Sequence, residues 1–287
     1  MASIAATAPL RVAALQMTSA ADVTLNLEVA ARLLAEAGAA GARVAVLPEN
    51  FSFMGVHDAD KRAIAEADGD GPVQRFLSQQ ARALRMWIVG GTTPLAIEAG
   101  ARVAAACLVY DDDGRRAARY DKMHLFDVDI PGKAESYRES RNTAPGARPV
   151  LVPTPAGLLG LSVCYDMRFP ELYRELVSRG AQWLAMPAAF TVPTGRAHWE
   201  TLLRARAIEN LCYVVAPAQW GTHTSGRETY GDTLIIDYWG QVLSRLAKGT
   251  GVITADIDLT QLTETRQRFP ALDNRRLGPA AAAAAES

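Results

Sequence analysis

The chain is poor in cysteine and has no long apolar run. Its cysteines, Cys107, Cys164 and Cys212, are odd in number and far apart, with no CxxC pair. This pattern argues against a disulfide framework and against a zinc site, and it suits a reducing compartment. No apolar stretch approaches the length of a membrane span, and the first residues lack a basic n-region. We therefore expect a cytoplasmic protein that does not contact membranes.

An excess of charge of one sign is also missing. The formal net charge is −1, and no basic stripe or charge run is present, which argues against nucleic-acid binding. The 287 residues, 49% hydrophobic and 21% charged, are typical of a globular protein with a substantial core. Most basic residues are arginine, so a lysine in a tight loop carries more information; the lysines are Lys61, Lys122, Lys133 and Lys248.

Short runs of Val, Ile and Leu alternate with helical patterns along the chain. We expect strands at 11–16, 43–47, 87–92, 102–110, 116–120, 150–152, 158–163, 183–186, 212–217, 233–237, 241–245 and 251–256. We expect helices at 25–40, 73–84, 171–179, 197–210 and 259–268, and irregular loops at 121–147 and 221–231. Strand–helix alternation combined with hairpins predicts an α/β fold whose sheets are covered by helices. One domain should span 10–278, with flexible tails at 1–9 and 279–287.

A thiol, a carboxylate and an ammonium each follow a predicted strand directly. Cys164 lies at a strand-to-helix turn, where a side chain is presented beside free backbone N–H groups. Glu49 follows the strand 43–47, and Lys122 follows the strand 116–120. If these strands lie side by side in one sheet, their ends meet at one crevice. Glu49 would then be the base that activates the thiol, and Lys122 would stabilise an oxyanion together with a backbone N–H of the turn.

Each of these residues also has a structural interpretation. Cys164 alone would most simply be a small buried apolar side chain. Glu49 could be a solvated loop carboxylate or a helix N-cap ligand, and Lys122 a surface residue paired with Asp121. For His124, we favour a structural role over a Cys-His dyad.

Taken together, three motifs resemble the nitrilase (carbon–nitrogen hydrolase) superfamily. They are Leu-Pro-Glu-Asn around Glu49, Tyr-Asp-Lys-Met-His-Leu-Phe around Lys122, and Val-Cys-Tyr-Asp-Met-Arg-Phe-Pro-Glu around Cys164. The resemblance implies a four-layer α-β-β-α sandwich and amide hydrolysis through a Cys164 thioester, with no metal, no cofactor and a homodimeric assembly. It also implies a supporting carboxylate at Glu139 and an oxyanion site formed by Lys122 and the backbone N–H of Tyr165.

Further segments resemble the Nit-type amidases of this superfamily, among them 126–132, Glu139-Ser140 and Ala197-His198-Trp199-Glu200. These relatives imply a carboxylate-bearing amide substrate, which Arg168 could clamp through its planar guanidinium; pairing of Arg168 with Glu171 is the structural alternative. We expect hydrolysis with loss of ammonia. The segment 219–232, a candidate pocket rim, favours deaminated glutathione as the substrate.

Two alternatives stay open. The first is an ω-amidase that acts on 2-oxoglutaramate or 2-oxosuccinamate with the same chemistry. The second is a non-catalytic thiol-sensing or binding protein on the same fold, which would need an exposed thiol of low pKa.

Overall fold

The computed structural model describes residues 8–97, 102–130 and 136–277. The predicted tails, 1–9 and 279–287, lie outside the described residues except for residues 8 and 9. Among the described residues, no helix combines the length and the apolarity needed to cross a bilayer.

Two mixed sheets pack face to face. The first sheet has the order β18-β1-β2-β3-β5-β4, and β6 and β9 also pair with β5. Its strands are β1 (Leu10–Gln16), β2 (Val44–Val46), β3 (Trp87–Val89), β4 (Thr93–Ala96), β5 (Val103–Tyr110), β6 (Arg116–Asp121), β9 (Thr143–Ala144) and β18 (Gly251–Ile257). The second sheet is built in order from β10 (Leu151–Thr154), β11 (Gly157–Leu161), β12 (Trp183–Ala185), β13 (Tyr213–Ala216), β16 (Thr233–Ile236) and β17 (Val242–Leu246).

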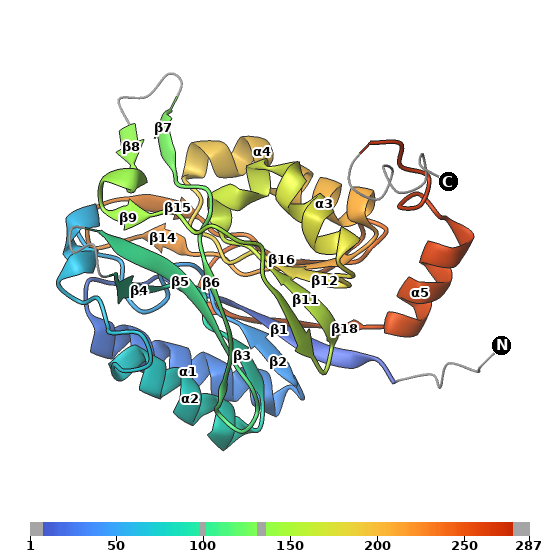
Figure 1. The fold of residues 1–287 in the computed structure, drawn as a ribbon. Coiled ribbons are helices and arrows are strands. Elements are labelled where there is room, and N and C mark those ends of the chain that lie inside the picture. The colour runs from blue at the N-terminus through green and yellow to red at the C-terminus, as the bar shows by residue number, and fades with distance from the viewer. Residues whose placement is uncertain (1–7, 98–101, 131–135, 278–287) are drawn as a thin grey trace.

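Helices cover the outer face of each sheet (Figure 1). Helices α1 (Val23–Ala39) and α2 (Pro72–Leu84) lie against the first sheet, and α3 (Pro170–Ser178) and α4 (Val192–Asn210) lie against the second. A further helix, α5 (Leu259–Arg268), follows β18. The arrangement is the four-layer α-β-β-α sandwich that the sequence predicted.

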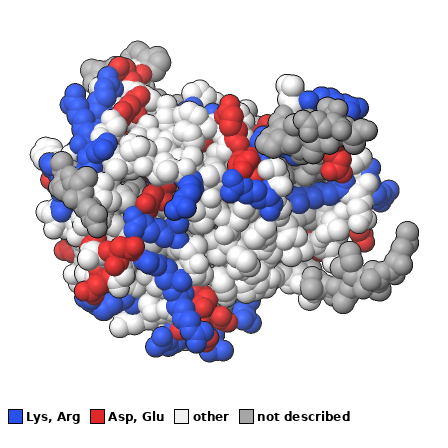
Figure 2. Space-filling model, viewed as in Figure 1, with Lys and Arg blue, Asp and Glu red and all other residues white. Residues whose placement is uncertain are grey.

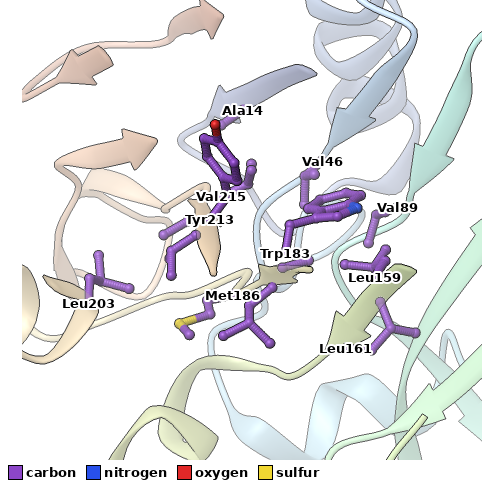
Figure 3. Close-up of a cluster of buried hydrophobic side chains, with 14 of the residues drawn as sticks. Ala14, Val46, Val89, Leu159, Leu161, Trp183, Met186, Leu203, Tyr213 and Val215 are labelled. Atoms are coloured by element: carbon purple, nitrogen blue, oxygen red, sulfur yellow. The ribbon is translucent and has the colours of Figure 1, made fainter. Parts of the chain in front are cut away.

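Successive side chains of a strand point to opposite faces of the sheet, so they belong to two separate core layers. In β1, Val12 and Ala14 belong to the apolar cluster between the sheets, whereas Ala13 and Leu15 belong to the cluster under α1 and α2. Trp183, fully buried, lies between the sheets near Val46 and Val89 (Figure 3). Strands β1, β2, β3 and β5 are therefore largely buried on both faces, which explains their nearly continuous apolar sequences.

Several predicted strand and helix boundaries were wrong at glycine and proline residues. The strand expected at 87–92 ends at Val89, and a separate strand, β4, follows it. Gly91 has φ +48°, and a Cβ there would lie 1.9 Å from the carbonyl oxygen of Pro48, so the chain must turn at this point. Helix α4 begins at Val192 and not at 197, because its proline lies in the first turn, where no N–H is needed.

The two segments expected as loops contain short strands. The segment 121–147 includes the hairpin of β7 (Asp127–Asp129) and β8 (Ser136–Arg138), together with β9. The segment 221–231 forms most of a second hairpin, β14 (Trp220–Thr222) with β15 (Glu228–Tyr230). Figure 2 shows acidic and basic side chains interspersed on the visible face, without a dominant patch of one sign.

Candidate active site

The sequence-predicted thiol lies at a strained turn. Cys164 opens a short 3-10 turn, Cys164–Arg168, between β11 and α3. Its φ is +48°, a left-handed conformation that non-glycine residues rarely adopt. Its N–H donates a hydrogen bond to the carbonyl of Pro187 (2.9 Å), which helps to hold the turn. The side chain is 9% exposed and lines a pocket.

Lys122 is among the largest buried side chains of the described residues. It follows β6, is 2% exposed, and its Nζ donates to Glu49 Oε1 (2.8 Å) and to Glu139 Oε2 (2.9 Å). The surface interpretation of Lys122 is wrong, because Asp121 pairs instead with Arg119 (2.8 Å).

Glu49 is likewise enclosed. It is 5% exposed, and its backbone carbonyl accepts a hydrogen bond from Gln219 Nε2 (3.0 Å). The next residue, Asn50, has φ +57°, and its N–H donates to Thr92 Oγ1 (2.8 Å). These bonds fix the loop after β2, so Glu49 is not a solvated loop carboxylate.

The strand ends do not meet in a single sheet, contrary to the sequence prediction. Glu49 and Lys122 follow β2 and β6 of the first sheet, whereas Cys164 follows β11 of the second. Packing of the two sheets brings their ends together, so the candidate site lies between the layers. All three side chains line the same pocket.

Glu139 holds Lys122 from the other side. It begins the short turn Glu139–Arg141, and its Oε2 also accepts a hydrogen bond from the N–H of Phe126 (2.7 Å). The carboxylate therefore has fixed donors on two sides and positions the ammonium group between itself and Glu49.

The charges of this cluster determine which groups are ionised. Burial by itself would lower the pKa of Lys122, but the adjacent carboxylates of Glu139 and Glu49 outweigh it and raise that pKa well above its usual range. Burial acts to raise the pKa of Glu139, and the charge of Lys122 overcomes it, so the net shift is downward. Burial, followed by the negative charge of Glu49, raises the pKa of the Cys164 thiol. The resting site thus holds a lysinium, ionised Glu139 and a protonated thiol.

Sequence reasoning missed the function of Asp166. This carboxylate is fully buried and accepts hydrogen bonds from Tyr120 Oη (2.6 Å) and from the N–H groups of Val163 (2.8 Å) and His124 (3.0 Å). Its Oδ1 also lies 2.7 Å from His124 Nδ1. Asp166 therefore ties the turn that begins at Cys164 to the segment that carries Lys122.

The contacts of His124 agree with the structural role that the sequence favoured. Its ring stacks on Phe169 with ring centroids 3.7 Å apart, and one ring nitrogen faces Asp166. Its described contacts are thus to the framework of the site.

Arg168 reaches the pocket and does not pair with Glu171. Its Nη1 lies 3.2 Å from His198 Nδ1, and its guanidinium carbon lies 5.4 Å from the ring centroid of Phe190 and 5.8 Å from that of Tyr165. These contacts place a cation against aromatic rings at the end of the turn that begins at Cys164.

The pocket has an inner and an outer chamber. The inner chamber contains the thiol, the Glu49–Lys122–Glu139 cluster and Arg168. A wider outer chamber adjoins it, and the residues that line both chambers form a neck: Asn50, Asp58, Lys61, Tyr137 and Arg227.

Known proteins resemble this chain in sequence and in fold. A family model described as carbon-nitrogen hydrolase matches residues 11–267. The deaminated glutathione amidase of a Synechocystis species is 43% identical over 93% of this chain and 98% of its own length, and the human protein of that name is 42% identical over 92% and 82%. Among solved structures, the Caenorhabditis elegans NitFhit protein superposes with a TM-score of 0.88 at 39% identity, over 94% of this chain and 66% of that one. Saccharomyces cerevisiae Nit3, described as a member of branch 10 of the nitrilase superfamily, gives a TM-score of 0.85 at 28% identity, over 96% and 100%.

Proposed function

The chain belongs to the carbon–nitrogen hydrolase family, and from this premise we propose that it hydrolyses deaminated glutathione through a thioester on Cys164. The observation that carries the proposal is the inner chamber, where a thiol shares one enclosed space with a lysinium held between two carboxylates. A carboxylate base, a nucleophile and a fixed cation are the parts that acyl transfer requires.

The raised pKa of the thiol assigns the first step to Glu49. At neutral pH, the buried Cys164 is protonated, so it needs a base at the moment of attack. Glu49 takes the proton as Sγ bonds to the amide carbon, and the carbonyl oxygen becomes an oxyanion. Lys122 Nζ and the N–H of Tyr165 stabilise that oxyanion. Glu139 keeps Lys122 in place, so it is a positioning residue.

Collapse of the tetrahedral intermediate breaks the C–N bond. Glu49 returns its proton to the leaving nitrogen, and the acyl group remains on Sγ as a thioester. Glu49 then takes a proton from water as the water oxygen attacks the thioester carbon. The second tetrahedral intermediate expels the thiolate, which recovers the proton, and the acid product leaves.

The identity of the leaving group corrects one detail of the sequence prediction. In deaminated glutathione, the amide joins a 2-oxoglutaryl group to cysteinylglycine. Its hydrolysis therefore releases the amine of a dipeptide, and ammonia is the product only of a primary amide such as 2-oxoglutaramate.

Arg168 is suited to bind the carboxylate of the acyl group. It lines the inner chamber beside the thiol, and no described residue forms a salt bridge with it. Its guanidinium is oriented by His198 and by the rings of Phe190 and Tyr165. A planar, pre-oriented guanidinium matches a carboxylate in a bidentate arrangement.

The two alternatives have less support. Relatives at 38–43% identity carry the name deaminated glutathione amidase, which supports this substrate over the ω-amides. A thiol sensor requires an exposed thiol of lowered pKa, whereas Cys164 is 9% exposed and its pKa is raised.

We also propose that the protein is a cytoplasmic homodimer. An exposed apolar cluster supports self-association: Ile208 of α4 lies beside Gly240, and the ring of Trp239 lies 5.4 Å from that of Phe269. Clusters of exposed large apolar side chains are typical of interfaces.

A substrate comparison tests the proposed function. Purified protein is incubated separately with deaminated glutathione and with 2-oxoglutaramate, and kcat/KM is measured from cysteinylglycine or ammonia release. We expect a clear preference for deaminated glutathione. A preference for 2-oxoglutaramate would make the protein an ω-amidase, and no hydrolysis of either compound would contradict the proposed substrate class.

A further inference from the structure

The neck between the two chambers holds a cation that the proposed mechanism does not use. Arg227 lies in the turn between β14 and β15 and lines both chambers. The acyl-binding Arg168 lines only the inner one. A substrate that reacts at Cys164 and extends into the outer chamber must therefore pass Arg227.

The guanidinium of Arg227 is held in place but incompletely bonded. Its Nη2 donates to the carbonyl of Ala189 (3.0 Å), and its guanidinium carbon lies 5.1 Å from the ring centroid of Tyr137. Its Nε is buried and has no hydrogen-bond partner. Nε is closed off by protein atoms, so an anion in the neck would accept from the outer nitrogens of the guanidinium. In the described part of the chain, the hydrogen bond of Nη2 to Ala189 is the only one that the guanidinium makes.

The hairpin that carries Arg227 is firmly anchored. The ring nitrogens of His223 lie 2.8 Å from the carbonyl oxygen of Ser19 and 2.7 Å from Thr229 Oγ1. The N–H of His223 also donates to the carbonyl of Arg227 (2.9 Å). The cation is thus presented on a fixed element, as a specific binding site requires.

Other charges near the neck leave a positive balance. Lys61 also lines both chambers, and in the described part of the chain neither Lys61 nor Arg227 takes part in a salt bridge. Asp58 lines both chambers as well, and the outer chamber adds one further cation, Arg196, and one further anion, Glu228. Among the described residues that line the outer chamber, three cations therefore face two carboxylates, which favours a singly charged anion.

We propose that Arg227, assisted by Lys61, binds a carboxylate on the leaving-group side of the substrate and so selects peptide-like amides over primary amides. This inference rests on the proposed function and names the part of the substrate that the neck recognises. In deaminated glutathione, the terminal carboxylate belongs to glycine, the second residue beyond the scissile bond. Two extended residues span about 7 Å, which would carry the carboxylate from the thiol toward the neck.

The test separates this subsite from the catalytic centre. We would measure kcat/KM on deaminated glutathione, on its analogue with a neutral glycinamide end, and on 2-oxoglutaramate. The variant is R227Q. The matched control is R196Q, which removes the same charge from an exposed side chain of the outer chamber.

We expect wild type to prefer the acid over the glycinamide analogue by roughly 10- to 100-fold, the effect of one hydrogen bond to a charged group. R227Q should remove this preference while turnover of 2-oxoglutaramate falls far less, and R196Q should change the preference by less than about threefold, as expected for a screened surface charge.

Three outcomes would overturn the inference. Equal wild-type activity on the acid and on the glycinamide analogue would refute the subsite and leave the amidase function intact. An equal loss on all three substrates in R227Q would show that Arg227 only positions Ala189. Wild type inactive on every amide would refute the proposed function itself.

Discussion

Replacing Lys122 with methionine should lower the unfolding free energy of the protein, by an amount that depends on pH. Methionine fills a similar volume but removes the ammonium that lies 2.8 Å from Glu49 and 2.9 Å from Glu139. Two carboxylates then face each other with little access to solvent. Breaking a buried ion pair by removing one partner costs about 3–5 kcal/mol of unfolding free energy, because an uncompensated charge remains.

The pH dependence of this loss follows from the direction of each pKa shift. In the wild type, the folded-state pKa of Glu139 is lowered, so its contribution is complete above the unfolded value of about 4.3 and is lost as the pH falls through the folded value. The pKa of Lys122 is raised, so its contribution is complete below about 10.4 and is lost only at higher pH. Both contributions are therefore constant between pH 5.5 and 8.

In K122M, a pH dependence appears in this range that the wild type lacks. Repulsion between Glu49 and Glu139 raises the pKa of one carboxylate above its unfolded value, and the folded state then binds an extra proton. The stability of the variant should consequently fall as the pH rises from 5.5 to 8.

Urea unfolding measures this effect through the fluorescence of the buried Trp183 and Trp199. The double variant K122M/E139Q is the control, because it removes one of the two repelling charges and retains an oxygen that accepts from Phe126 N–H. It should be more stable than K122M at pH 8. A loss below about 1 kcal/mol in K122M, the size of an exposed pair, or an equal loss at both pH values, would refute this reasoning.

Two further substitutions test the framework of the site. Y120F removes one donor to the buried Asp166 and should lower the unfolding free energy by about 1–2 kcal/mol; an unchanged urea midpoint would contradict the bracing role of Asp166. G195A places a Cβ 2.1 Å from Tyr230 Cγ and should destabilise the protein by about 2 kcal/mol or more through overpacking. The matched helix substitution G38A meets its nearest atom at 3.8 Å and should instead stabilise by about 0.5–1 kcal/mol, and a similar effect of both on the melting temperature would show that the Tyr230 contact is not limiting.

Much of the layer architecture could be predicted from the sequence, because the local sequence signals agree with the final fold. Apolar residues at helical spacing end near Gly41, and α1 ends at Ala39. Helix α4 was harder to delimit, because Pro193 and Gly195 resemble helix breakers. Gly195 is explained only by the ring of Tyr230, which packs where a Cβ would be.

The catalytic candidates were visible because each follows a strand within a distinctive motif. The residues that hold these candidates in place could not be predicted, because their contacts join segments that are distant in the sequence. Asp166 is 46 residues from Tyr120 and 42 from His124, and nothing local marks it as a buried acceptor. Arg227 lies in a segment whose glycines and polar residues suggest a loop, and its position at the neck depends on the hairpin that contains it.

The most direct test of the account is turnover of deaminated glutathione by C164A, compared with the wild type at matched melting temperature. If Cys164 forms the thioester, kcat should fall by about 10⁴-fold or more, as expected for loss of a nucleophile. The Glu49–Lys122–Glu139 cluster should remain folded around the empty position. If C164A kept a substantial fraction of the wild-type rate, the thioester mechanism would be wrong.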